Sequence, residues 1–121
     1  MDKRNVDVAI IGAGTAGMVA YQRVRKATDN LVLVESGQYG TTCARVGCMP
    51  SKLLIAAAES AHNMRHGDLF GVVAGGVTVD GRQVMERVRT ERDRFVGGVL
   101  HAVENFPETH RLKGHARFIG P

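Results

Sequence analysis

The sequence predicts an α/β fold in which a parallel sheet has helices on its faces. Two apolar runs rich in β-branched residues, 6–11 and 31–34, have the composition of buried parallel strands. The residues from Thr15 to about Lys26 suit a helix, and the pair Asp29-Asn30 forms a turn before the second run. This strand–helix–strand unit spans about 30 residues, the length expected of a parallel βαβ crossover.

Two further helices are predicted in the middle of the chain. Pro50 stands where the first turn of a helix tolerates an imino acid, and that helix is expected to run to about Arg65. After an irregular stretch rich in glycine, residues 81–105 place apolar side chains at helical spacing, with Asp80 as the expected N-cap. Along the sequence, both helices lie between the strand–helix–strand unit and the C-terminal end of the chain.

The last part of the chain predicts an extended segment. Pro107 is expected to stop the long helix, and residues 111–119 have the pattern of a strand or a hairpin arm broken at Gly114. The sequence stops at Ile119-Gly120-Pro121, within this predicted strand context. We therefore expect a piece cut from a longer protein rather than a natural terminus.

Composition limits the size and class of the protein. The 121 residues, 44% hydrophobic and 23% charged, suit one globular domain at most. No run approaches the roughly 20 apolar residues that cross a bilayer, so we expect a cytoplasmic protein without a membrane partner. Most of the excess positive charge comes from arginines at 82–94 that alternate with acidic residues, as on a solvated helix face. A nucleic acid partner is therefore not expected either.

A glycine pattern lies between the first predicted strand and the first helix. Gly12, Gly14 and Gly17 form G-x-G-x-x-G. The first glycine permits a tight turn, the second lets the backbone approach a pyrophosphate, and the third allows close helix packing. Thr15 and Ala16 supply adjacent amides at the positive end of the helix, where an anion is stabilised.

An acidic residue closes the second predicted strand. Glu35 lies about 20 residues beyond the glycines, where a carboxylate accepts hydrogen bonds from ribose hydroxyls and disfavours a 2′-phosphate. The glycine motif alone is weak evidence, because glycine turns are common. Together with the strand–helix–strand context and Glu35, it predicts that the parent protein binds an adenine dinucleotide. The motif does not distinguish FAD from NAD.

The only two cysteines, Cys43 and Cys48, follow this unit. In a regular helix, five positions separate two α-carbons by roughly 7.5 Å, which exceeds the usual limit for a disulfide. A bridge therefore needs non-helical backbone between them, which Gly47 makes easier. A thiolate near the start of the following helix would be stabilised by the helix dipole and by Arg45 or Lys52. We thus expect a lowered thiol pKa, as exchange chemistry requires.

Two other interpretations of the cysteines stay open at this point. They could be buried, inert neighbours with a packing role. A zinc site would need more ligands than two cysteines. His62 and His66 share a helix face at i, i+4, but they lie at least fourteen residues beyond Cys48, so no metal site is expected.

The segment from Gly40 to Lys52, Gly-Thr-Thr-Cys-Ala-Arg-Val-Gly-Cys-Met-Pro-Ser-Lys, resembles the active-site signature of the class I pyridine nucleotide-disulfide oxidoreductases. With the glycine pattern and Glu35, the sequence is most similar to the dihydrolipoamide dehydrogenase-like branch, which has glutathione and mercuric reductases as relatives. The resemblance covers essentially all of residues 1–121. It implies the N-terminal part of a Rossmann-like FAD-binding domain, with the nicotinamide and dimerisation domains absent.

The resemblance implies how FAD would be held. The cofactor would lie extended, with its pyrophosphate at Gly12–Gly17 and its adenosine ribose at Glu35. Thr42 would line the cofactor together with the first cysteine, and Lys52 would stabilise negative charge on the reduced flavin. The segment Gly114-His115-Ala116 matches a short family segment, so the backbone of Ala116 would meet the adenine.

The resemblance also implies separate roles for the two cysteines. Cys48 would be the sulfur next to the flavin, and Cys43 would be the interchange thiol that attacks the substrate disulfide. Thr41 and the pair Ala44-Arg45 depart from the residues common in the family. Because Arg45 adds charge beside the cysteines, the substrate need not be lipoamide.

The expected activity belongs to a longer protein. That protein would pass electrons between NAD or NADP, FAD, the cysteine pair and a small-molecule or protein-bound disulfide or dithiol, and it would be a homodimer. The 121 residues alone are expected to be inactive and to hold FAD weakly or not at all. An alternative is a stand-alone dinucleotide-binding redox module without turnover.

Overall fold

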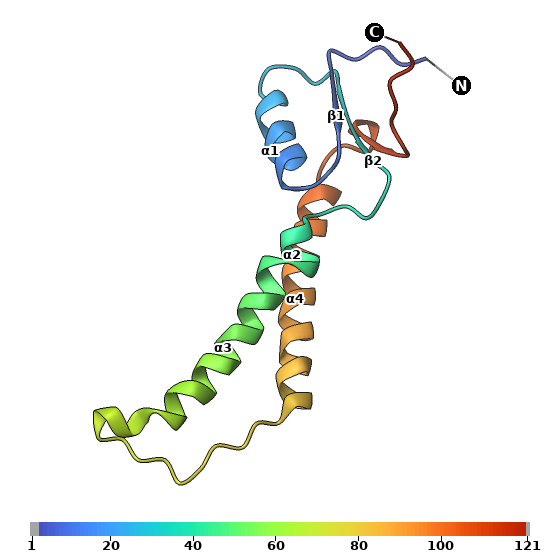
Figure 1. Cartoon of the computed structure of the whole chain (residues 1–121). Helices are drawn as coiled ribbons and strands as arrows, with labels where there is room; N and C mark the ends of the chain where they lie inside the picture. The colour runs from blue at the N-terminus through green and yellow to red at the C-terminus, as the bar shows by residue number, and fades with distance from the viewer. Residues whose placement is uncertain (1–2, 121) are drawn as a thin grey trace. The chain divides into compact units, whose positions relative to one another are not determined.

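A computed structural model describes residues 3–120 of the chain (Figure 1). The chain divides into two compact units, which are described separately below. The first consists of Met1–Thr42 together with Val96–Pro121, and the second consists of Cys43–Phe95.

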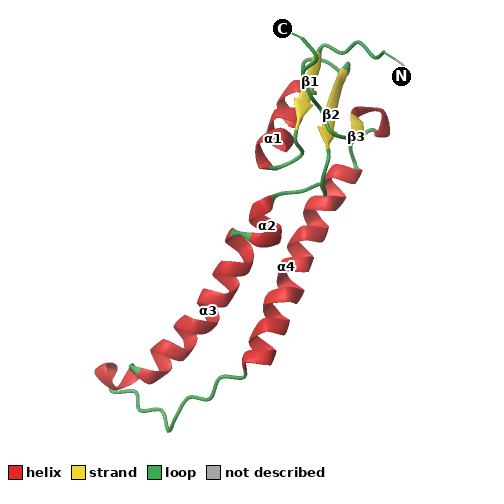
Figure 2. Cartoon of the chain, turned by 45° about the vertical axis from the view of Figure 1, so that its right-hand side comes forward, coloured by secondary structure: helices red, strands yellow, loops and turns green. Residues whose placement is uncertain are grey.

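The first unit is built on a parallel sheet of three strands in the order β1-β2-β3 (Figure 2). The strands are β1 (Val8–Ile11), β2 (Leu31–Glu35) and β3 (Arg111–Lys113), and helix α1 (Thr15–Val24) connects the first two. In the register, Val8 pairs with Leu31 and Leu33 pairs with Arg111. The predicted α/β class and strand–helix–strand unit are confirmed, although β1 begins two residues later than the apolar run.

The C-terminal extended segment forms the predicted strand, which ends directly before Gly114 as expected but does not continue to Ile119. β3 pairs with β2 in the parallel sense, so it is a sheet strand and not a hairpin arm. The strand ends at Lys113, and the amide of Gly114 donates a hydrogen bond of 3.0 Å to the carbonyl oxygen of Glu35. Residues 115–120 form no strand, so the strand context expected for Ile119-Gly120 is wrong, and Pro121 lies outside the described residues.

The core of the first unit combines the sheet with segments from both ends of the unit. Its buried members are Ile10, Ala13, Tyr21, Leu31, Leu33, Val103 and Phe106. The rings of Tyr21 and Phe106 stack with centroids 3.9 Å apart. The Tyr21 hydroxyl and Nδ1 of the buried His110, in the short 3-10 helix Glu108–His110, are hydrogen-bonded at 2.8 Å. The sequence pattern correctly placed Tyr21 in a helix but did not predict this polar contact.

The second unit is mainly helical. It contains most of α2 (Thr42–Val46), all of α3 (Cys48–Arg65), the short 3-10 helix Gly67–Phe70 and the first part of α4 (Gly81–Glu104). The predicted ends of α3 and α4 agree with these bounds to within about two residues. Within this unit, α3 runs beside the first part of α4 (Figures 1 and 2), and a guanidinium nitrogen of Arg87 donates to the carbonyl oxygen of Leu53 at 3.4 Å.

The predicted N-cap of α4 is confirmed. Oδ1 of Asp80 accepts hydrogen bonds from the amides of Arg82 at 2.9 Å and Gln83 at 3.1 Å, which satisfies two amides of the first turn. By contrast, α3 has no buried residue, and Leu54, Ile55 and Met64 are about half exposed. The apolar side of α3 is therefore largely uncovered.

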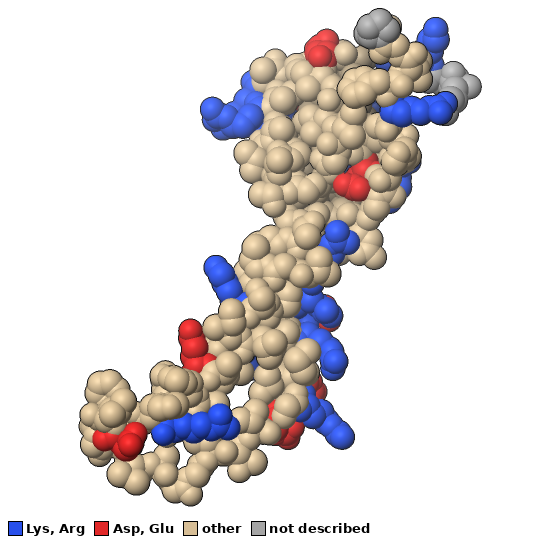
Figure 3. All heavy atoms as spheres, in the orientation of Figure 1, with Lys and Arg blue, Asp and Glu red and all other residues tan. Residues whose placement is uncertain are grey.

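Charges of both signs are interspersed along the helices of the second unit on the face shown in Figure 3. Arg94 pairs with Glu91, and Arg92 pairs with Asp93. This arrangement fits the predicted solvated face. Among residues 3–120, no helix combines the length and apolar character needed to span a bilayer.

Candidate functional site

The turn after β1 has the geometry that its glycines predict. Gly12 has φ +97°, in the left-handed region that favours glycine, and its amide donates to the carbonyl oxygen of Val34 at 2.7 Å. A Cβ added to Gly17 would lie 1.8 Å from the carbonyl oxygen of Gly12 and 3.5 Å from Cγ2 of Ile10. The start of α1 therefore packs against the turn so closely that only glycine fits at position 17.

Gly14 has the opposite surroundings. It is the N-cap of α1 without a side-chain capping bond, and a Cβ added there would meet nothing within 4 Å. The neighbouring Thr15 and Ala16 are exposed, and the first amides of a helix have no intrahelical acceptor. The open space beside Gly14 and these amides at the positive helix end suit an anionic group such as a pyrophosphate.

The carboxylate of Glu35 joins the turn after β1 to the turn after β2. Its Oε2 accepts a hydrogen bond from the amide of Ala13 at 2.7 Å, and its Oε1 accepts one from the amide of Gly37 at 2.7 Å. Both bonds hold the pKa of Glu35 below its ordinary value, and the bond from Ala13 has the larger effect. The charge of Lys113 lowers this pKa further. Glu35 is therefore a charged, doubly anchored acceptor.

A cavity of about 100 Å³ brings together predicted residues that are far apart in sequence. Its lining includes Gly12 from the first turn, Glu35 from the end of β2, and Ala116 from the segment after β3. The complete lining is Ile11, Gly12, Val34, Glu35, Ser36, Gly114, His115 and Ala116. The sequence pattern did not predict that Ile11 and Ser36 belong to this site. Each is the direct neighbour of a predicted site residue, Gly12 or Glu35, and this adjacency could have identified both.

The residues of the first unit fit an adenine dinucleotide. The amides at the start of α1 and the open space at Gly14 suit the phosphates, while Glu35 and Ala116 line one cavity. The two carboxylate oxygens keep lone pairs for ribose hydroxyls beyond their bonds to Ala13 and Gly37. Thr42, expected to line the cofactor, is exposed at the first position of α2.

The cysteine pair flanks a break between two helices. α2 ends at Val46, Gly47 has φ −120° and ψ −114°, outside the helical region, and α3 begins at Cys48. The expected departure from helical geometry between the cysteines is found at Gly47 alone, whereas Ala44, Arg45 and Val46 remain helical in α2. Both cysteines are free thiols, with Cys43 partly buried and Cys48 exposed, so the interpretation as two buried cysteines does not hold.

The two thiols interact, and the direction of the pKa shift of Cys43 is opposite to the expected one. A side-chain hydrogen bond to Cys48 raises the pKa of the Cys43 thiol, and burial raises it further. The charge of Lys52 lowers this pKa, as predicted, but its effect is smaller than that of the hydrogen bond. The prediction of a lowered thiol pKa is therefore wrong for Cys43, because the Cys48 side chain and burial raise its pKa more than Lys52 lowers it.

The first turn of α3 fixes the residues that follow Cys48. Pro50 lies in this turn, as predicted, and the hydroxyl of Ser51 donates to the carbonyl oxygens of Gly47 at 3.0 Å and Cys48 at 3.1 Å. Lys52 is exposed on the same turn. Local backbone bonding thus orders the segment from the helix break to Lys52.

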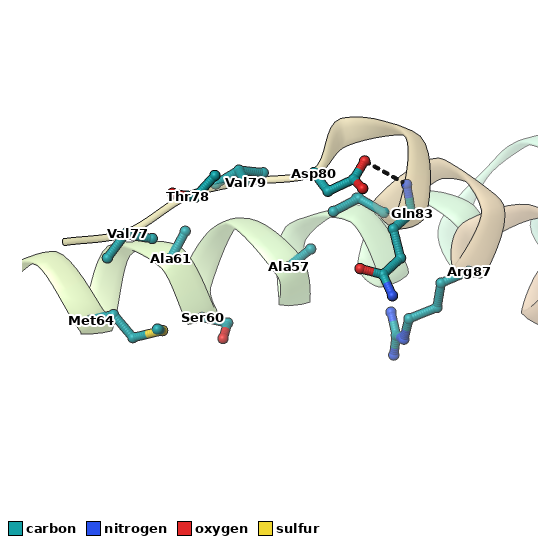
Figure 4. Close-up of a pocket in the computed structure, with 11 residues that line it drawn as sticks. Ala57, Ser60, Ala61, Met64, Val77, Thr78, Val79, Asp80, Gln83 and Arg87 are labelled. Carbon is teal, nitrogen blue, oxygen red and sulfur yellow. Dashed lines mark hydrogen bonds between the residues drawn. The ribbon is translucent and has the colours of Figure 1, made fainter. Parts of the chain in front are cut away.

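A separate groove of about 410 Å³ lies within the second unit (Figure 4). Its lining comes from α3, from the segment Val77–Asp80 and from the start of α4, and it is mostly apolar apart from residues such as Ser60 and Arg87. It contains none of the predicted site residues. In residues 3–120, no group of three or more potential ligands is arranged to hold a metal ion.

Comparison with known proteins agrees with the geometry. The family model described as pyridine nucleotide-disulphide oxidoreductase matches residues 6–114. The chain is 35% identical over 115 residues to a dihydrolipoyl dehydrogenase of Bacillus subtilis (strain 168), which covers 95% of this chain and 24% of that protein. It is 33% identical over 131 residues to a dihydrolipoyl dehydrogenase of Cupriavidus necator, covering 97% of this chain and 27% of that protein. The chain thus spans about a quarter of the length of these relatives.

A solved structure has the same fold. The HOCl-induced flavoprotein disulfide reductase RclA from Escherichia coli superimposes with a TM-score of 0.69 at 24% identity, covering 99% of this chain and 23% of that one. Because the family model matches nearly the whole chain, this protein belongs to the pyridine nucleotide-disulphide oxidoreductase family.

Proposed function

We propose that this chain is the N-terminal part of the FAD-binding domain of a flavoprotein that moves electrons between NAD(P)H and a disulfide or dithiol substrate. The observation that supports this most directly is the pair of free thiols, Cys43 and Cys48, which lie on either side of a helix break at Gly47. The glycine turn after β1, from Gly12 to Gly17, supports FAD as the cofactor. The matched relatives are named as dihydrolipoyl dehydrogenases and a disulfide reductase.

FAD would be held by residues of the first unit and of the segment that follows it. The amides at Gly14, Thr15 and Ala16 would bind its pyrophosphate, and Glu35 would accept hydrogen bonds from the ribose. Gly12 and Gly17 shape this turn, and the backbone of Ala116 would face the adenine. Thr42, Cys43 and Lys52 would line the flavin end, where the Lys52 ammonium stabilises negative charge.

The cysteines would perform thiol–disulfide exchange. For reduction of a substrate disulfide, the thiolate of Cys43 attacks one substrate sulfur, the substrate S–S bond breaks, and a mixed disulfide forms. The other substrate sulfur leaves in this first step. The sulfur of Cys48 then attacks that of Cys43, which releases the substrate sulfur held in the mixed disulfide and leaves a Cys43–Cys48 disulfide. Two electrons pass to the substrate, and its two sulfurs take up two protons. When bound, FAD would carry two electrons from NAD(P)H to the Cys43–Cys48 disulfide and so return it to two thiols.

The remaining properties of the whole protein follow from the same proposal. The substrate is a small-molecule or protein-bound disulfide, and the charge of Arg45 near the cysteines allows substrates other than lipoamide. The full-length protein is a cytoplasmic homodimer that acts on neither nucleic acid nor membranes, and the 121 residues alone do not turn over. The choice between NAD and NADP depends on residues outside this chain.

The exchange step can be tested on this chain directly. The protein is equilibrated with mixtures of reduced and oxidised dithiothreitol, and its free thiols are then alkylated and counted by mass spectrometry. We expect both thiols to disappear together in one transition to an intramolecular disulfide. Cys43→Ser and Cys48→Ser should each leave one thiol that forms a mixed disulfide instead. Thiols that stay reduced throughout, or that pair only between molecules, would contradict the proposal.

The alternative, a stand-alone redox module without turnover, predicts a shorter open reading frame than the enzyme does. An open reading frame that continues past residue 121 into a second G-x-G-x-x-G motif supports the enzyme. A stop codon directly after Pro121 supports the module.

A further inference from the structure

We propose that His62 and His66 form a two-ligand site on α3 for a late first-row divalent metal ion such as Ni(II) or Cu(II). The two side chains lie one turn apart on the same helix face, and both are exposed. Their rings are stacked with centroids 4.1 Å apart and an angle of 28° between the ring planes. Imidazole is a preferred ligand of Ni, Cu and Zn ions.

The ring separation is close to what one metal ion requires. Two imidazole nitrogens on the same ion, each at about 2.1 Å, lie about 3 Å apart when they occupy neighbouring positions. The ring centroids of His62 and His66 already lie 4.1 Å apart. The pair is therefore close to a chelating arrangement before any ion binds.

A hydrogen bond fixes which nitrogen of His66 is available. Nδ1 of His66 lies 2.9 Å from the carbonyl oxygen of His62, and because a carbonyl oxygen only accepts, Nδ1 is the donor. In the neutral ring, Nε2 then keeps the lone pair that binds a metal. A ring N–H held by a backbone carbonyl is the usual orienting contact of metal-binding histidines.

The surroundings of the pair do not oppose a cation. His66 is the C-cap of α3, so the ion would lie at the negative end of the helix dipole. Arg65 and Asp68 flank the pair with opposite charges. With two protein ligands, and water completing the coordination, the site is exchangeable rather than structural.

The inference concerns α3 alone, so it does not depend on FAD, on the cysteines or on the proposed function. The probe is Ni(II), titrated into untagged protein by calorimetry. Cys43→Ser and Cys48→Ser are combined as the background for all variants, so that thiols neither bind nor reduce the metal. We expect one Ni(II) per chain.

Removal of either histidine should weaken binding by about tenfold or more, because the second imidazole acts at a high effective concentration. His101→Ala in α4, which removes another exposed histidine, should leave the affinity unchanged. A second control combines His66→Ala with Met64→His, which keeps the number of histidines but separates them by two positions, so that they no longer share a face. It should bind as weakly as His66→Ala.

Circular dichroism of each variant shows whether the helices remain. If His62→Ala or His66→Ala retains the parent affinity, or if the control with histidines at positions 62 and 64 recovers it, the two-ligand site is wrong. Equal losses in all variants, including His101→Ala, would also overturn it.

Discussion

The carboxylate of Glu35 lies 2.7 Å from the amide nitrogen of Ala13, so the end of β2 is bonded to the glycine turn that follows β1. A second bond, to the amide of Gly37, occupies the other carboxylate oxygen. Glu35 thus holds two loops in place, in addition to the ribose contact proposed for it.

Replacement of Glu35 should therefore affect stability even without a ligand. Glu35→Gln replaces one acceptor oxygen with an NH₂ group that cannot accept from an amide. Because the carboxylate is partly exposed, the expected loss is only about 1 kcal/mol in the free energy of unfolding at pH 7. Urea unfolding measures it.

The same substitution has a defined pH dependence. Two amide bonds hold the pKa of Glu35 below its ordinary value of 4.5, so its contribution to stability is present above that value. It is lost as the pH falls through the lower folded-state pKa. The stability difference between the wild type and Glu35→Gln should shrink below pH 4.5 and not toward alkaline pH. A difference that stays constant down to strongly acidic pH would argue against this account.

Gly17 and Gly14 offer a matched pair of substitutions. Gly17→Ala places a Cβ 1.8 Å from the carbonyl oxygen of Gly12, so the backbone must shift, at an expected cost of about 1–3 kcal/mol in stability. Gly14→Ala meets no atom within 4 Å and should change stability by less than about 0.5 kcal/mol. If the proposed pyrophosphate site is right, however, Gly14→Ala should weaken FAD binding. Denaturant unfolding of this chain and equilibrium dialysis of the full-length protein with FAD separate the two effects.

The thiol of Cys43 should become more reactive when its partner is removed. The hydrogen bond to Cys48 raises the pKa of Cys43, so less thiolate is present at a given pH. Cys48→Ala removes that bond, lowers the pKa and should speed alkylation of Cys43 by iodoacetamide below its ordinary pKa of 9.0. Lys52→Ala should shift the pKa in the opposite direction and by less. Rates measured by mass spectrometry across a pH series test both directions, and a slower reaction in Cys48→Ala would refute the assignment.

The buried contact between Tyr21 and His110 should contribute to the stability of the first unit. Tyr21→Phe keeps the ring that stacks on Phe106 but leaves the buried His110 nitrogen without its hydrogen bond. The expected cost is about 1–3 kcal/mol in thermal or denaturant unfolding. Tyr39→Phe, which keeps the ring that Lys113 contacts, should cost less than about 0.5 kcal/mol.

The features that the sequence predicted correctly depend on local rules. The apolar runs, the glycine turn and the Asp80 cap each involve neighbouring residues whose backbone preferences are well defined. The helix break at Gly47 was predicted because a disulfide and a regular helix have incompatible geometry. In each case, the residues that decide the structure lie within a few positions of one another.

The features that the sequence could not predict depend on contacts between distant segments. The partner and direction of β3 are set by pairing with β2. Tyr21 meets Phe106 and His110 only after the unit has folded. The raised pKa of Cys43 depends on the effect of the Cys48 side chain, which spacing alone does not give.

The central position of β2 has a consequence for synthesis. One edge of β2 can pair with β1 once the first βαβ unit has left the ribosome, but the other edge pairs with β3, which emerges only after α3 and α4. Pairing between distant segments is slow, and an unpaired strand edge invites aggregation. Nascent chains that stall before residue 111 should therefore need a chaperone, and the wall of the cavity formed by Gly114 and Ala116 is completed last.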